Sequence, residues 1–232
     1  MSNSQKTPPG ASLRDAVAVG ASPARQQRSQ QKRDRLINAL DKLLKKKPFD
    51  QITISEIAKT AKVSPATIYQ RFNRKDAAIS ILIELYLLRT SQWATHNPAI
   101  SSVKDSRDLY TALVSIGHSA WLQVESLGHI MRPAYLYSRL RPDLLGPAWT
   151  QMQASAFSGF KSFLSHFESD IKTDDLDNAS ATIANFFNLM LLGPLLHPEI
   201  DRQGAQNADA FSRELADFAF LYLTHSKHRE HS

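Results

Sequence analysis

The chain of 232 residues is long enough for one large or two small domains, and its 42% hydrophobic content is typical of a globular protein. It contains no cysteine, which excludes disulfide bonds and thiolate metal sites and fits a reducing cytosol. The longest apolar run, 189–196, is broken by Gly193 and Pro194, so we expect a cytoplasmic protein without a membrane-spanning helix.

The net charge of +6 is unevenly distributed along the chain. Residues 1–96 contain 17 Lys and Arg against 7 Asp and Glu, whereas residues 97–232 contain 11 against 15. A basic first part joined to a mildly acidic remainder indicates that the first part binds a polyanion such as nucleic acid. A solvated lysine-rich surface is the alternative, because charge reports on partners and not on fold.

Residues 1–27 are rich in Ser, Gln, Pro, Ala and Gly and show no periodicity, so we expect a disordered basic arm. Ordered structure is predicted to start near Arg28. The first helix should end at Lys47, because Pro48 cannot continue it, and Phe49 and Ile52 should anchor the connection. Its apolar stripe is Leu36, Ile37, Leu40, Leu43 and Leu44.

Two short helices are predicted next. Thr53 followed three residues later by Glu56 has the form of a capping box that starts a helix of about two turns. Ser64 suits the N-cap of a following helix over 65–72, and Pro65 suits its first position. The residues expected to face the core are Ile54, Ile57, Ala58, Ala61, Ile68 and Phe72.

The remainder of the chain also reads as helical. A long helix is expected from about Asp76, in its first turn, to about His96, and no later segment alternates as a strand would. Breaks are expected at glycine and proline positions that include Gly128 and Pro133. The predicted architecture is therefore all-α, with further helices over about 105–126, 143–168, 175–195 and 207–225.

A helix followed by two short helices and a three-residue turn between them is the arrangement of a helix-turn-helix, whose second short helix enters the DNA major groove. Short helices need a shared core, which leaves the other face of 65–71 available for DNA. Gln70 can donate to and accept from one base edge, and Thr67 offers a hydroxyl and a methyl group. The side chains that suit phosphate oxygens are Tyr69, Lys75, Ser55 and Thr53.

The run ITISEIAKTAKVSPATIYQRFNRKDAAI, residues 52–79, resembles the DNA-binding region of the tetracycline-repressor (TetR) family of bacterial transcriptional regulators. The resemblance covers about 45 residues with the preceding helix. It implies a homodimer with two DNA-binding domains, and a C-terminal helical domain that dimerises and encloses a ligand. The ligand would release the protein from DNA. The matching positions are Ile57, Ala58, Ala61, Val63, Ser64, Thr67, Tyr69, Phe72 and Lys75.

The chain departs from the family pattern at two positions. Lys62 stands where the family usually has a turn glycine, and Ala66 stands where it usually has a glycine inside the reading helix. A lysine adopts a positive φ only at a cost, whereas alanine is the better helix former. The predicted DNA contacts are Thr53, Ser55, Lys62, Ser64, Pro65, Ala66, Thr67, Tyr69, Gln70, Arg71 and Lys75.

No catalytic motif is present: we find no H-E-x-x-H, no G-x-S-x-G and no phosphate-binding glycine loop, so neither an enzyme nor a cofactor is expected. His129 lies among apolar residues and should be a hydrogen-bonded core histidine. Spaced histidines near the C-terminus are expected to be solvated rather than to bind a metal. These are His225, His228 and His231.

Aromatic residues are unusually frequent around the helix expected at 143–168. Core packing is one interpretation, and a cavity for a small apolar or aromatic effector is the other. The residues predicted to contact such an effector are Trp121, Met131, Tyr135, Tyr137, Trp149, Met152 and Phe160.

The last two predicted helices are apolar on more than one side and must be buried on more than one side. A subunit core would account for this, but together with the resemblance we prefer a four-helix interface between two copies. Such a two-fold dimer requires a palindromic operator. The predicted dimer contacts are Ile183, Phe187, Met190, Leu191, Phe211, Leu215, Phe218 and Tyr222.

The predicted domains are a helix-turn-helix domain over 28–75 and an effector-binding and dimerisation domain over 76–225, flanked by the arm 1–27 and a polar tail 226–232. The predicted function is that of a ligand-responsive transcriptional regulator, a repressor of a double-stranded DNA operator. The alternatives are a nonspecific architectural DNA-binding protein and an enzyme on a helical scaffold that uses histidines with Tyr135 or Tyr137. Additional phosphate or minor-groove contacts are expected from Arg25, Arg28, Lys32 and Arg33.

Overall fold

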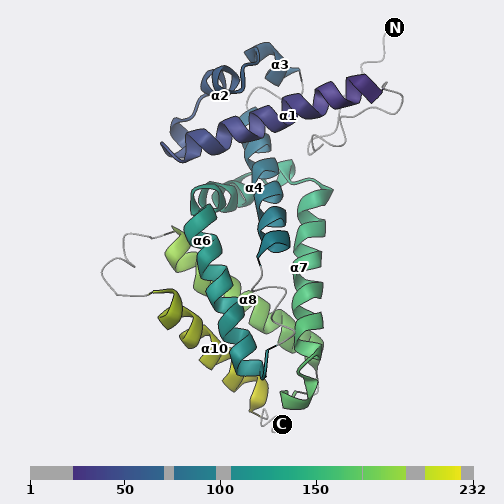
Figure 1. The fold of residues 1–232 in the computed structure, drawn as a ribbon, viewed down its shortest axis with the longest axis vertical. Coiled ribbons are helices and arrows are strands. Elements are labelled where there is room, and N and C mark those ends of the chain that lie inside the picture. The colour runs from purple at the N-terminus through teal and green to yellow at the C-terminus, as the bar shows by residue number, and fades with distance from the viewer. Residues whose placement is uncertain (1–22, 71–75, 98–105, 174, 197–206, 226–232) are drawn as a thin grey trace. The chain divides into compact units, whose positions relative to one another are not determined.

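A computed structural model describes residues 23–70, 76–97, 106–173, 175–196 and 207–225. Every regular element among these residues is a helix (Figure 1), which confirms the all-α prediction. The chain forms two compact units: unit 1 consists of residues 1–91 and 129–152, and unit 2 of residues 92–128 and 153–232. Unit 1 is larger than a helix-turn-helix domain because residues 129–152 pack with it.

Helix α1 (Pro23–Leu44) begins five residues before the predicted start near Arg28, inside the segment that we expected to be a disordered arm. Its predicted apolar stripe is confirmed for Leu36, Ile37 and Leu40, which are fully buried. The helix ends at Leu44, three residues earlier than predicted, because the amides that follow do not continue the regular helical hydrogen-bond pattern. Those of Lys46 and Lys47 both donate to the carbonyl of Leu43.

Three short elements follow α1 in unit 1: η1 (Phe49–Gln51), α2 (Ile54–Ala61) and α3 (Pro65–Tyr69). The capping box at Thr53 and the N-cap at Ser64 are both present as predicted. Helix α3 is shorter than the predicted span 65–72, and Phe72 lies outside the described residues. The buried apolar residues that hold these elements are Phe49, Ile52, Ile57, Ala58, Ala61 and Ile68.

Helix α4 (Ala77–His96) starts directly after Asp76, one residue later than predicted. Helix α6 (Leu109–Leu140) is 32 residues long and continues through Gly128 and Pro133, so the predicted break at these positions is wrong. A proline inside a helix removes one backbone hydrogen bond and crowds the preceding turn. Here Ile130 and Ala134 are buried around Pro133, and their burial offsets part of that cost.

Unit 2 contains the first part of α6 and the helices α7 (Pro147–Ser165, from residue 153), α8 (Leu176–Leu196) and α10 (Ala208–Thr224), with the short η4 (Glu168–Asp170). The short η3 (Pro142–Leu144) belongs to unit 1. Helices α6 and α10 approach closely at Gly117, where a Cβ atom would come within 3.0 Å of the Ser212 Cα atom. The core side chains include Leu109, Leu113, Trp121, Leu164, Phe167, Ile183, Phe187, Phe211 and Leu215.

Helix α8 is long and apolar enough to cross a membrane by length and composition, with a mean hydropathy of 1.4, and it is the one such helix among the described residues. The same composition is typical of a helix buried on several sides. In unit 2 its Ala179, Ile183 and Phe187 pack in the core, whereas Leu189 is 66% exposed. Part of the apolar surface of α8 therefore remains uncovered in a single chain.

Candidate nucleic-acid interface

The turn between α2 and α3 is built on Lys62, which adopts a left-handed conformation with φ 55° and ψ 47°. Its amide donates to the carbonyl of Lys59 at 3.2 Å, and the amide of Val63 donates to the carbonyl of Ala58 at 3.0 Å. These two bonds satisfy carbonyls at the end of α2, as a C-terminal glycine usually would. The turn therefore forms without glycine, at a cost of about 1–2 kcal/mol for a residue with a Cβ atom.

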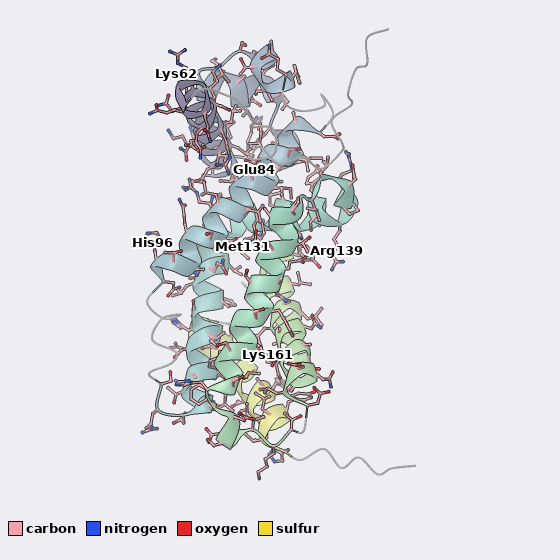
Figure 2. The ribbon with its side chains drawn as sticks, turned by 90° about the vertical axis from the view of Figure 1, so that its right-hand side faces the viewer. Lys62, Glu84, His96, Met131, Arg139 and Lys161 are labelled. Atoms are coloured by element: carbon pink, nitrogen blue, oxygen red, sulfur yellow. The ribbon has the colours of Figure 1, made fainter. Side chains whose placement is uncertain are left out.

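Lys62→Gly is expected to stabilise the protein by about 0.5–1 kcal/mol, because relief of the left-handed strain exceeds the added entropy of the unfolded chain. The measurement is urea denaturation of both proteins. Lys62 is also exposed on the outside of unit 1 (Figure 2), so its loss should weaken binding to all DNA sequences alike if it contacts phosphate. Lower stability of the variant would contradict the strain argument.

Helix α3 presents polar groups on a firmly anchored scaffold. Ile68 is fully buried, whereas Ala66 and Gln70 are exposed. The hydroxyl of Ser64 accepts from the amide of Thr67 at 3.3 Å, and the two hydroxyls lie 2.9 Å apart. Gln70 is therefore the predicted base-reading side chain with the most exposed position. Pro65 is also exposed, Tyr69 and Thr67 are half-buried, and Arg71 and Lys75 lie outside the described residues.

The N-terminus of α2 is held by a network of charged and polar groups. The carboxylate of Glu56 accepts from the Thr53 amide at 2.9 Å and from Lys47 Nζ at 2.7 Å. Lys47 and then Thr53 lower the pKa of Glu56 to about 2, so the capping carboxylate stays ionised at neutral pH. The hydroxyl of Thr53 is itself bonded to Glu56, whereas Ser55 is exposed. Thr53 thus positions α2, and Ser55 is free of that capping role.

Three polar or aromatic contacts join residues 129–141, which are the end of α6 and the residue after it, to other parts of unit 1. His129 Nε2 lies 3.1 Å from Asp41 Oδ1 on α1, the Tyr137 ring packs edge-on against Phe49 with centroids 5.0 Å apart, and Arg141 donates to Asp76 at the start of α4. The predicted hydrogen bond of His129 is confirmed. Its partner could not be named from the sequence, because Asp41 is 88 residues away.

Asp41 is the centre of the first of these contacts. Arg89 on α4 donates to Asp41 from Nη2 at 2.6 Å and from Nε at 3.0 Å, and it also bonds Asn38. Burial raises the pKa of Asp41, but the hydrogen bonds from His129 and Arg89 outweigh it, so the pKa lies below its usual value. One buried carboxylate thus joins α1, α4 and α6.

The residues predicted to contact an effector are divided between the two units. In unit 1, Trp149 packs on Tyr86 with ring centroids 5.3 Å apart, and the guanidinium group of Arg139 lies over the ring of Tyr135. In unit 2, Trp121 is buried against Phe211. Core packing therefore accounts for contacts of several of these residues, and their role towards an effector stays a prediction. Phe160 contacts Phe163 and Phe187 in unit 2, while Met131, Tyr137 and Met152 are half-buried in unit 1.

The residues predicted to form a dimer interface fall into two groups. Four of them are covered by their own chain and pack in the core of unit 2, and their role in a dimer stays a prediction: Ile183, Phe187, Phe211 and Leu215. Phe218 is 60% exposed, and its ring contacts Phe186 with centroids 5.5 Å apart. Leu189 and Leu221, which are not among the predicted dimer contacts, are 66% and 54% exposed. Met190, Leu191 and Tyr222 are half-buried.

Among the C-terminal histidines, His225 is exposed, and its Nδ1 donates to the Leu221 carbonyl at 3.2 Å. His228 and His231 lie outside the described residues, as does the expected tail over 226–232.

Comparison with known proteins agrees with this geometry. A sequence model described as bacterial regulatory proteins, tetR family, matches residues 36–78, which include α2 and α3. No curated protein sequence gives a match. Among solved structures, the fatty acid degradation regulator FadR from Bacillus halodurans is 15% identical, with a TM-score of 0.57 over 87% of this chain and 97% of that one.

Two further solved structures are similar. A protein described as a TetR-family transcriptional regulator from Mesorhizobium loti is 21% identical, with a TM-score of 0.59 over 84% of this chain and 96% of that one. The TetR family repressor AlkX from Dietzia sp. is 19% identical, with a TM-score of 0.50 over 88% and 97%. These identities show a shared fold. Residues 36–78, which contain the helix-turn-helix, therefore match the tetR family of bacterial regulatory proteins, and the chain as a whole shares the fold of these regulators.

Proposed function

We propose that this DNA-binding regulator is a repressor that binds a palindromic operator as a homodimer and leaves it when a small apolar or aromatic effector binds. The observation that carries the proposal is the geometry of α3. A helix of five residues is capped by Ser64, anchored by the fully buried Ile68 and ends with the exposed amide of Gln70. Such a helix has little surface for a core of its own and is suited to enter a major groove.

The uncovered apolar surface of unit 2 supports the homodimer. We define this surface by Leu189, Phe218 and Leu221, on α8 and α10. Large apolar side chains exposed together on a soluble chain mark an interaction site. A two-fold contact through this surface would bring two copies of α3 to one duplex, so the operator would repeat with the same two-fold symmetry.

The contacts of α6 supply a route by which an effector would act on DNA binding. A ligand that favours another position of residues 129–141 would act on α1 through His129 and Asp41 and on the start of α4 through Arg141 and Asp76. A ligand shifts such an equilibrium only by its difference in affinity between the two positions. The release step therefore requires an effector that binds the DNA-free form more tightly.

Selection of binding sites from random duplexes tests the DNA-binding part of the proposal, and the selected sequences should contain an inverted repeat. Gln70→Ala is then expected to weaken binding to the selected operator by about 1–3 kcal/mol for each subunit, or roughly 5–150-fold per subunit, because each subunit loses one base contact. Its binding to unrelated duplexes should change little.

Gln151→Ala, which removes an exposed glutamine on α7, is the matched control and should bind the operator like the wild type. Selected sequences without a palindrome would contradict the proposal and favour a nonspecific DNA-binding protein. Native mass spectrometry of the purified protein then counts subunits and detects a bound small molecule, whose addition should release the operator. An operator complex unaffected by every ligand that binds the protein would contradict the release step.

A further inference from the structure

The N-terminal half of α1 extends beyond the core of unit 1. Residues 23–35 precede Leu36, the first buried apolar residue, and also precede the segment matched by the family model. At 1.5 Å per residue this part of the helix is about 20 Å long. Residues 26–35 contain no apolar side chain, and all but Ser29 and Arg33 are exposed. Residues 26–35 are therefore helical although they have no apolar side chain to bury against the rest of unit 1.

Its positive charges lie on one flank of the helix. Arg28, Lys32, Arg35 and Lys42 are spaced by four, three and seven residues, which places them within an arc of about 80° at 3.6 residues per turn. All four are exposed. Within the part of the chain that the structure describes, none of the four forms an ion pair with a carboxylate, and Asp34 and Asp41 lie outside this arc. We call these four residues the basic flank.

The other side of α1 is occupied by α4. Arg33 donates to Glu84 at 2.7 Å, and Asn38 and Asp41 both bond Arg89. The charge of Arg33 is paired with a buried carboxylate, and its expected contact with DNA stays a prediction. Figure 1 shows α4 on one side of α1, and α2 and α3 on the other. The basic flank is therefore turned away from α4.

The chemistry of the basic flank selects a polyanion. Arg28 and Lys32 are like charges one turn apart, an arrangement that slightly destabilises a free helix and is relieved by a negatively charged partner. A membrane surface would also require an apolar face, which residues 26–35 lack. Duplex DNA presents closely spaced phosphates and needs only cations for contact. In the proposed function, α3 binds DNA, and α3 and α1 both belong to unit 1, so duplex DNA is the polyanion expected near the basic flank.

We propose that the basic flank of α1 binds backbone phosphates of the duplex outside the segment read by α3. The inference rests on the proposed function for the presence of DNA, and it adds a second, sequence-independent contact. Each cation that meets a phosphate releases a counterion and steepens the salt dependence of binding. The reading helix would set the site, and the basic flank would increase affinity for the longer duplex.

The test uses the full chain with Arg28→Gln, Lys32→Gln and Arg35→Gln combined. Glutamine has nearly the same helix propensity as lysine and arginine, so the helix should be retained. Lys42 is left unchanged because its neighbours on α1 belong to the core. The slope of log affinity against log salt concentration should become shallower by about 3 for each subunit bound, since each lost phosphate contact contributes about 0.9. Circular dichroism confirms that helix content is retained.

The location is tested with two duplexes. One carries only the selected site, and the other carries the same site with about one helical turn of unrelated sequence on each side. The wild type should bind the longer duplex more tightly by roughly tenfold or more, and the triple variant should lose most of that gain. A triple variant with the wild-type salt slope and the wild-type gain would overturn the proposal.

A matched control removes three exposed cations from unit 2 through Arg107→Gln, Lys172→Gln and Arg213→Gln, and it should keep the wild-type salt slope. An equal change of slope in this control would mean that net charge alone acts, and would also overturn the proposal. Failure of the proposed function is distinguishable from failure of this inference, because the selection from random duplexes would then yield no palindrome. In that case the same salt slopes, measured on a random duplex of fixed length, still decide whether the basic flank binds DNA.

Discussion

Phe218→Asp is expected to convert the protein from a dimer to a monomer and to abolish tight operator binding. Phe218 is 60% exposed in a single chain, so the substitution leaves the core of unit 2 intact. Burial of a phenylalanine contributes about 1.5–3 kcal/mol, and a two-fold interface contains the residue twice. The dimer should therefore lose about 3–6 kcal/mol, which raises its dissociation constant by roughly 10²–10⁴.

Sedimentation equilibrium and operator binding measure the two effects of Phe218→Asp. Leu122→Asp is the control, because Leu122 is an exposed apolar residue of unit 2 on α6, outside the surface formed by Leu189, Phe218 and Leu221. It should remain dimeric. A dimeric Phe218→Asp protein with wild-type operator affinity would show that the two copies meet elsewhere.

Asp41→Ala is expected to reduce the free energy of unfolding by about 3 kcal/mol. The substitution leaves Arg89 and His129 without their shared carboxylate in a partly buried position, and removal of one partner from a buried ion pair is strongly destabilising. Urea denaturation measures the change. Asp50→Ala, which removes an exposed carboxylate of the same unit, should alter stability by less than about 0.5 kcal/mol. Equal losses in the two variants would contradict a special role for Asp41.

The pH dependence gives a second readout for Asp41. Its pKa in the folded protein lies below the usual 3.8, so its contribution is fully present above pH 3.8 and is lost as the pH falls through the lower, folded pKa. Asp41→Asn should therefore lose less stability than the wild type between neutral and strongly acidic pH. The Glu56 carboxylate contributes equally to both proteins and cancels in the comparison.

The local signals in the helix-turn-helix were readable because they involve residues three to five positions apart. The Thr53 and Glu56 capping box and the Ser64 N-cap need only the chain within one turn, and the structure contains them all. Lys62 also formed the turn at the place that the spacing predicted, since its bonds to Ala58 and Lys59 are equally local.

Helix ends that depend on tertiary packing could not be predicted from such local sequence signals. Gly128 and Pro133 are intrinsic helix breakers, yet α6 continues through both because neighbouring residues such as Ala134 are buried. The same limit applies to Arg33, whose ion-pair partner Glu84 lies 51 residues away. Long-range partners are not visible in local periodicity.

The sequence by itself therefore determined the all-α class, the helix-turn-helix with its caps, and the family model that residues 36–78 match. Only the tertiary structure decided which apolar faces of α8 and α10 are already covered, and it separated the core residue Phe187 from the exposed Phe218. It also brought Asp41, Arg89 and His129 together and left the basic flank of α1 uncovered. The physical reason is that helical periodicity records how apolar a face is, whereas burial depends on which distant element packs against it.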